Sequence, residues 1–141
     1  MSINLILANR EGPIHVAYAD ESTAAVVARL TEKRIGAMPV VDGDRVVGIF
    51  SERDVIHSLN EHGGAALDKP VSAGMTSPVV TVNPDTGIME ALALMTRRRI
   101  RHLPVVDDER LIGIVSIGDL VKFRIEAIEA EAAAMRDYIA S

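Results

Sequence analysis

Apolar positions along the chain follow two periods, and the changes from one to the other predict its elements. A helical spacing of i, i+3, i+4 and i+7 occurs twice, each time after polar residues that can cap a helix. A short apolar run at 79–82 predicts a strand before the second helix, and the first copy repeats this order. The two helical faces are Thr23, Val26, Val27, Leu30 and Ile88, Ala91, Leu92, Met95; the capping candidates are Asp20 or Ser22, and Asp85 or Thr86.

Two pairs of short apolar runs follow these helices and predict two pairs of strands. An acidic turn separates the members of each pair, and Asp42-Gly43 in the first turn is typical of a hairpin. The second strand of each pair runs directly into Ser-x-x-Asp and another helix. The unit is therefore β-α-β-β-α, present twice, in an α/β (α+β) arrangement. The predicted strands are Met38–Val41 with Val46–Phe50, and Leu103–Val106 with Leu111–Val115.

The second half of the chain repeats the first at a constant offset of 65 residues. Eleven of the twenty-two positions in 34–55 are identical to those in 99–120, and Pro13 falls on Pro78. Such an offset indicates a duplicated unit, and two copies suggest packing about a pseudo-two-fold axis rather than a solenoid. The segment Gly63–Gly74 is the linker candidate. We expect repeat 1 at 1–66, repeat 2 at 67–125 and a C-terminal helix extension at 126–141.

The motif Ser-x-x-Asp stands at both points where a strand becomes a helix, as Ser51–Asp54 and Ser116–Asp119. One interpretation is a capping box, in which the hydroxyl and the carboxylate satisfy backbone amides at the start of the helix. The other is a ligand site, because a helix N-terminus attracts anions and an Asp one turn in can accept from both hydroxyls of a ribose. The two roles can coexist.

A strand that ends in Gly-Ile-(Phe or Val)-Ser-x-x-Asp, preceded by Pro-Val-Val-Asp and present twice, resembles a tandem pair of CBS domains, the family named after cystathionine β-synthase. The resemblance covers roughly residues 7–125. It implies two β-α-β-β-α units joined through their sheets. It also implies two clefts that bind an adenosyl ligand as regulator, such as AMP, ADP, ATP, NAD or S-adenosylmethionine.

Carried over position by position, the resemblance assigns Asp54 and Asp119 to the ribose hydroxyls. It assigns Ser51 and Ser116 to the ribose or the phosphate. The backbone at the start of one strand in each copy would face the adenine. The residues concerned are Ala37, Met38 and Pro39 in the first copy and His102, Leu103 and Pro104 in the second.

The two copies differ where a phosphate would lie. The first has Arg53 inside its motif, whereas the second has a run of arginines before its strand. A solvated helix end that complements the helix dipole remains an alternative for Arg97 and Arg98. Arg99 and Arg101 alternate with Ile100, so we expect one of them to turn toward the cleft, where a guanidinium suits phosphate.

His102 is the only one of the four histidines in a motif position. It is a candidate phosphate donor, with a partly buried structural role as the alternative. We therefore expect the two clefts to differ in affinity, and the cleft near Arg101 and His102 to prefer phosphorylated ligands. The histidine spacings contain no helical metal pair, so no metal site is predicted.

From Val121 to Ile139 the chain contains no Gly or Pro and consists of strong helix formers. Its apolar residues alternate at spacings of four and three, which is an a/d seam sustained over fewer than three heptads. The helix either packs on its own domain or extends to a partner subunit. The disc-like homodimers that the resemblance implies favour the second. The seam is Val121, Ile125, Ile128, Ala132, Met135 and Ile139.

Composition narrows the range of functions. The 141 residues include no Cys and no Trp, only two Tyr and two Phe, and carry a net charge of −5. Acidic charge and few aromatic residues argue against a nucleic-acid binder. The absence of Cys excludes disulfides and Cys-ligated metals. No apolar run approaches the roughly 18 residues of a membrane span, so we expect no membrane partner and a cytoplasmic location.

Two classes of function stay open. The first is an adenine-nucleotide sensor whose occupancy changes the angle between the units or the dimer, acting on a separate regulated protein. The second is a structural module for dimerisation or protein interaction whose clefts bind nothing. Intact Ser and Asp in both copies favour the first. We expect no enzyme and no catalytic cofactor: the barrel of inosine monophosphate dehydrogenases, which contain CBS pairs, needs about 250 residues.

Overall fold

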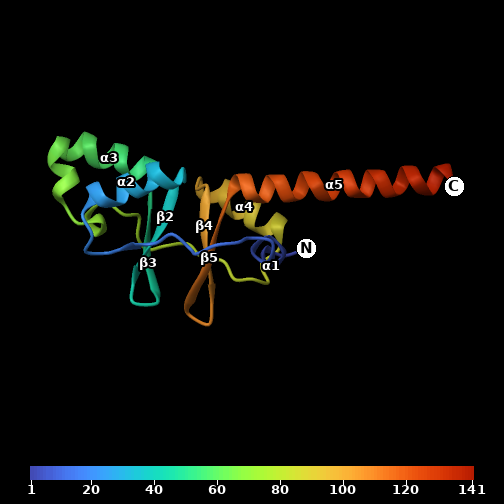
Figure 1. Cartoon of the computed structure of the whole chain (residues 1–141), viewed down its shortest axis with the longest axis horizontal. Coiled ribbons are helices and arrows are strands. Elements are labelled where there is room, and N and C mark those ends of the chain that lie inside the picture. Colours follow the sequence, from blue (N-terminus) through green and yellow to red (C-terminus); the bar gives the residue numbers. More distant parts are fainter.

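Two units of similar structure lie side by side in the computed structural model, which describes residues 1–141, and a long helix projects from the second (Figure 1). The shared elements of the two units stand 65 residues apart, so the repeat predicted from the sequence is confirmed. The first unit contains β1 (Ala17–Tyr18), α2 (Thr23–Lys33), β2 (Ala37–Asp42), β3 (Arg45–Ser51) and α3 (Glu52–His62). The second contains α4 (Ile88–Arg98), β4 (His102–Asp107), β5 (Arg110–Ser116) and α5 (Ile117–Ala140).

Both predicted hairpins are present. The strands β2 and β3 pair antiparallel, with β1 added parallel to β2, whereas β4 and β5 form a two-stranded antiparallel sheet. The turns enter the left-handed region that tight hairpins require. Gly43 has a φ of 65°, and in the second hairpin Asp108 and Glu109 have φ values of 51° and 65°. Across the two units, β3 lies against β5.

The strand predicted at 79–82 is wrong. Only Val82 takes part in pairing, through an isolated parallel bridge to Val105. Its amide donates to the Pro104 carbonyl over 3.0 Å, and the Val106 amide donates to the Val82 carbonyl over 2.8 Å. Pro78 lacks a donor before this point, and a turn held by the Thr86 hydroxyl begins directly after it. The two flanks leave room for a single bridge.

The helix starts agree with the capping predictions in the first unit and differ in the second. Ser22 caps α2, because its hydroxyl accepts from the Ala25 amide over 3.2 Å. The predicted caps Asp85 and Thr86 are wrong: α4 has Gly87 at its N-cap, with no side-chain hydrogen bond. The Thr86 hydroxyl accepts instead from Asn83, and the Ile88 amide donates to the carbonyl of Met1. The start of the chain therefore supplies an acceptor that the local sequence lacks.

Each hydrophobic core is completed by a segment from the other half of the sequence. Ile3, in the short helix α1 (Ile3–Ala8), is fully buried in the second core with α4, β4 and β5. Val71 is fully buried in the first core, with Met75 packed against it. The linker candidate forms two 3-10 helices, η1 (Gly63–Asp68) and η2 (Val71–Ala73). The segments 3–7 and 71–75 thus cross between the units, an exchange that the linear bounds 1–66 and 67–125 do not express.

The C-terminal helix is continuous. The predicted extension at 126–141 is the distal part of α5, which starts at Ile117 and runs unbroken to Ala140. Its first turns are packed through Leu120, whereas the remainder extends into solvent (Figure 1). None of the helices is both long and apolar enough to cross a bilayer.

Gly48 in β3 tests whether residues 75–76 pack closely on this strand. A Cβ at this position would lie 2.6 Å from the Met75 sulfur and 2.9 Å from the Thr76 carbonyl oxygen. We expect Gly48→Ala to lower the free energy of unfolding by about 1–3 kcal/mol, the usual cost of overpacking, measured by urea denaturation. Gly64→Ala is the control, because nothing lies within 4 Å of a Cβ there. Equal stability of the two variants would contradict the close packing of 75–76 on β3.

Candidate functional site

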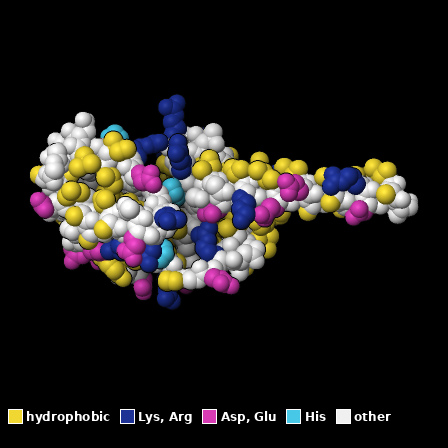
Figure 2. Space-filling model, turned by 45° about the horizontal axis from the view of Figure 1, so that its top comes forward, with side chains coloured by type: hydrophobic (Ala, Val, Ile, Leu, Met, Phe, Trp, Pro, Cys, Tyr) yellow, Lys and Arg dark blue, Asp and Glu magenta, His cyan; other side chains and the backbone are white.

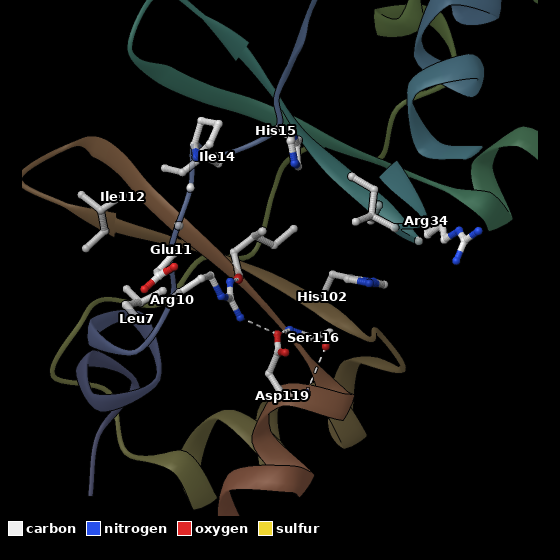
Figure 3. Close-up of a pocket in the computed structure, with 17 residues that line it drawn as sticks. Leu7, Arg10, Glu11, Ile14, His15, Arg34, His102, Ile112, Ser116 and Asp119 are labelled. Carbon is white, nitrogen blue, oxygen red and sulfur yellow. Dashed lines mark hydrogen bonds and ion pairs between the residues drawn. The ribbon is translucent and has the colours of Figure 1, made fainter. Parts of the chain in front are cut away.

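A cavity of about 500 Å³ opens between the two units, beside the N-terminus of α5 (Figure 3). This volume is within the range of small-molecule sites. Three segments form its walls: residues 10–15, which run between α1 and β1; the connection from α2 into β2; and β5 with the first turn of α5. The lining residues are Leu7, Arg10, Glu11, Gly12, Pro13, Ile14, His15, Arg34, Ile35, Gly36, Ala37, His102, Ile112, Gly113, Ile114, Ser116 and Asp119.

Ser116 and Asp119 form a capping box at the rim of the cavity. The Asp119 amide donates to the Ser116 hydroxyl over 3.1 Å, and the Ser116 amide donates to Asp119 Oδ2 over 2.7 Å. The capping interpretation is therefore confirmed for this motif. The hydrogen bonds to the Asp119 side chain all end on Oδ2, so Oδ1 remains available to accept from a ligand.

Arg10 contacts the carboxylate of Asp119, and no motif in the sequence predicts this contact. Its Nη2 lies 2.8 Å from Asp119 Oδ2, and its Nη1 donates to the Ile114 carbonyl (Figure 3). Arg10 stands 109 positions before Asp119 and belongs to no motif, so no local signal connects the two. In this state a guanidinium holds residues 10–15 against the start of α5.

His102 lines the cavity and lies against Gly36 of the first unit. A Cβ at Gly36 would lie 3.3 Å from the His102 ring carbon Cε1, so the absence of a side chain at Gly36 permits this approach. Burial lowers the pKa of His102 below its usual value, with Asp119 and Glu52 acting in the opposite direction. A neutral imidazole can both donate and accept a hydrogen bond.

The arginines predicted to reach the cleft do not line this cavity. Arg99 is the C-cap of α4, with a φ of 56°, and Arg101 is exposed outside it. Arg53 lies on α3, and its Nη1 donates to the Arg99 carbonyl over 3.4 Å. The arginine at the cavity is Arg34, the counterpart of Arg99 in the first repeat, which lies at the end opposite Leu7 and Glu11 (Figure 3). The left-handed C-cap conformation, rather than a strand, sets the direction of the chain at both positions.

Of the six residues predicted to face an adenine, only Ala37 and His102 line the cavity. Met38 and Leu103 are fully buried in the two cores, and Pro39 and Pro104 are buried in the hairpins. The apolar wall comes instead from Ile14, Ile35, Ile112 and Ile114.

In the first repeat the chain itself contacts the corresponding motif. Ser51 and Asp54 form the second capping box, and Asp54 Oδ1 accepts from the Thr76 hydroxyl over 2.9 Å. Thr76 also exchanges two backbone hydrogen bonds with Ile49, of 3.1 and 2.8 Å. Both oxygens of Asp54 are therefore engaged, and the segment at 75–76 lies directly on β3.

The charges around the open cavity are mixed. The cations Arg10 and Arg34 and the acids Glu11 and Asp119 lie on its walls, together with the imidazoles of His15 and His102. Guanidinium groups suit phosphate oxygens, and a helix N-terminus adds a partial positive charge. The arrangement can hold a ligand that combines an apolar ring, vicinal hydroxyls and an anionic group. No group of three or more His, Asp or Glu gathers in a geometry that would hold a metal ion.

The sequence model of the CBS domain family matches the chain twice, at residues 8–61 and 70–126. The mitochondrial CBS domain-containing protein CBSX3 of Arabidopsis thaliana is 34% identical over 125 residues, an alignment that covers 85% of this chain and 61% of that protein. This chain therefore spans less than two thirds of the length of that relative.

Solved structures of CBS-domain proteins have the same fold. The CBS-domain containing protein ATU1752 from Agrobacterium tumefaciens has a TM-score of 0.82 at 35% identity, covering 87% of this chain and 92% of that one. Two others contain ligands. The CBS domain pair of protein MJ0100 is in complex with 5-methylthioadenosine and S-adenosyl-L-methionine (TM-score 0.79, 26% identity, coverage 90% and 98%). CBSX2 is in complex with AMP (TM-score 0.71, 30% identity, coverage 81% and 89%).

His102 makes the stability of the fold depend on pH. Because its pKa is lowered in the folded chain, the unfolded chain binds more protons below about pH 6.5, and the free energy of unfolding falls as pH decreases through that region. We expect His102→Gln to lose less stability than the wild type between pH 7.5 and 5.5, measured by urea denaturation. His62→Gln, an exposed position on α3, should retain the wild-type loss. The same loss in His102→Gln as in the wild type would contradict the role of burial.

Proposed function

Because this chain belongs to the CBS domain family, as a tandem pair of CBS domains, we propose that it is a regulatory module that binds one adenine nucleotide in the cavity at the N-terminus of α5. The observation that carries the proposal is the carboxylate of Asp119, which faces a cavity of about 500 Å³ and keeps Oδ1 free. Two similar structures that contain adenosine derivatives, with AMP in one and S-adenosyl-L-methionine in the other, support the ligand class.

In this proposal Asp119 accepts from the ribose hydroxyls, and Ser116 contributes its hydroxyl to the ribose or the phosphate. The adenine packs between the isoleucines of the cavity wall and the backbone at Gly36 and Ala37. Arg34 and Arg10 are the cations available to the phosphate. His102, held neutral by burial, is a hydrogen-bonding partner rather than a second charge.

One ligand per chain is proposed, rather than two. A nucleotide at the first repeat would have to displace the Thr76 hydroxyl from Asp54 and two backbone hydrogen bonds between Thr76 and Ile49. At the second repeat it displaces contacts of one exposed side chain, the ion pair of Arg10 with Asp119 and its hydrogen bond to the Ile114 carbonyl. Exposed ion pairs contribute roughly 0.2–1 kcal/mol. A nucleotide therefore loses less free energy by displacing Arg10 from Asp119 than by displacing Thr76 from Asp54 and Ile49.

Binding would also change contacts outside the cavity. When a ribose takes over Asp119, the Arg10 guanidinium leaves it, and the contact that holds residues 10–15 against α5 changes. These residues continue α1, which packs on α5 through the second core. We propose that occupancy is transmitted along this route to the projecting helix and to a regulated protein.

The two aspartates of the capping boxes provide a matched pair for testing the site. We expect the wild type to bind AMP with one site per chain, and Asp119→Ala to weaken binding at least tenfold, measured by isothermal titration calorimetry. Asp54→Ala should keep the wild-type affinity. Each variant removes one capping box, which costs about 1 kcal/mol, so a loss of stability is common to both.

Two results would contradict this proposal. Equal weakening in the two variants would show that the sites are equivalent or that the effect is one of stability. The absence of a thermal shift with AMP, ADP, ATP, NAD and S-adenosylmethionine would favour a ligand-free structural module, whose Ser-x-x-Asp motifs serve only as caps.

Arg10 separates the ribose contact from the phosphate contact. We expect Arg10→Ala to bind adenosine roughly two- to fivefold more tightly, because the ion pair that competes for Asp119 is removed. Its affinity for AMP should rise less or fall, because a phosphate partner is lost. The measurement is the ratio of the two dissociation constants, with Arg98→Ala, an exposed residue outside the cavity, as the control. An unchanged ratio in Arg10→Ala would show that Arg10 does not contact phosphate.

A further inference from the structure

The distal half of α5 has no partner within the chain. The helix has 24 residues, about 36 Å in length, and its contacts with α1 and α4 involve the part nearest the body. Beyond residue 127 nearly every residue is exposed. Helices in water take most of their stability from tertiary packing of an apolar face, so a free helix of this kind is expected to find one.

An apolar seam runs along α5 from Val121 to Ile139. Ile125 and Ile128 are each about half exposed, at 49% and 48%, and Ile139 is 75% exposed. Figure 2 shows hydrophobic side chains following the projecting helix, with charged side chains beside them. The three isoleucines, together with Val121, Ala132 and Met135, have the alternating spacing of the a and d positions of a coiled coil. With Val121 at d, the a positions are Ile125, Ala132 and Ile139, and the d positions are Val121, Ile128 and Met135.

The charges that flank the seam match a second copy of the same helix in parallel. In a parallel in-register pair, each g position faces the e position five residues later on the partner. Arg124 then faces Glu129 of the partner subunit, and Glu131 faces Arg136 of the partner subunit. Symmetry repeats both contacts, so all four flanking pairs in the projecting half have opposite charges.

An antiparallel pair that covers the whole seam places like charges opposite each other. Its register sets Ile125 against Met135 of the partner subunit. Glu129 then faces Glu129 of the partner subunit, and Lys122 faces Arg136 of the partner subunit. A shorter antiparallel overlap pairs Arg124 with the partner's Glu131 but leaves Met135 and Ile139 uncovered. The charges and the seam are satisfied together only in the parallel register.

We propose that α5 is the dimerisation element of this protein, and that a second copy of the chain covers its seam as a parallel, in-register two-stranded coiled coil from Val121 to Ile139. The two bodies then lie at the same end of the coiled coil. The Arg10–Asp119 contact of each chain is at the base of this helix, so both cavities open next to the junction. The inference rests on the seam and its charges, and it does not require a nucleotide.

The chain contains no cysteine, so a single introduced one reports the register. In the parallel dimer the two residues at position 135 meet across the seam, within the Cα separation that a disulfide needs. We expect Met135→Cys to give a disulfide-linked dimer on mild oxidation, seen on a non-reducing gel. Ala130→Cys, on the opposite face of the same helix, should remain monomeric on that gel. Cross-linking of both variants to the same extent, or of neither, would overturn the parallel register.

Charge reversal tests the pairing itself. We expect Arg124→Glu to raise the dissociation constant of the dimer roughly threefold to tenfold, measured by sedimentation equilibrium, because two attractive contacts become repulsive. Addition of Glu129→Arg in the same chain should restore the wild-type value, because the pair is again opposite in sign. A wild type that is monomeric at 100 µM, or a double variant no better than the single one, would overturn the proposal. So would a chain truncated after Lys122 that stays dimeric. The AMP titration of Asp119→Ala is a separate result and leaves this one unaffected.

Discussion

The fold depends on the inability of either half to bury its own sheet. A hairpin of two strands, with at most one short strand added, is marginal in water and needs cover on its apolar faces. Each half therefore receives a segment from the other half of the sequence: Ile3 completes the second core and Val71 completes the first. The hairpins then meet through β3 and β5. The cavity lies between the units because this exchange brings residues 10–15 across from one to the other.

The same local contact does two different things in the two repeats. A Ser-x-x-Asp box starts α3 and α5 with nearly the same hydrogen bonds. What differs is the segment that crosses in front of each box. Thr76 presents a hydroxyl and its backbone to the first, and the hydroxyl donates to the Asp54 carboxylate. Arg10 reaches the second by a long side chain, which a ligand can displace without breaking backbone pairing. Two units with the same order of shared elements thus differ at this point: the chain itself contacts both oxygens of one carboxylate, whereas the other carboxylate faces an open cavity.

The projecting part of α5 extends this asymmetry to the assembly. The first eleven residues of α5 correspond to α3, whereas the rest has no counterpart in the first repeat. Its seam and flanking charges would join two chains next to their cavities. A change at the base of one helix would therefore alter the contact between the two chains. Such a contact would couple the cavity to a second site, as regulation requires.

The sequence by itself determined the duplication, the two hairpins, the two pairs of helices and both capping boxes. These features depend on hydrogen bonds and apolar periods within a few residues, such as the hydrogen bond between Asp119 and Ser116. Because such interactions are local, the sequence pattern is enough to predict them. The strand at 79–82, the cap of α4, the crossing of Ile3 and Val71, and the place of Arg10 at Asp119 were decided by the tertiary structure. Each depends on residues far apart in the chain, whose meeting follows from how the two units cover each other. No motif in the sequence records that arrangement.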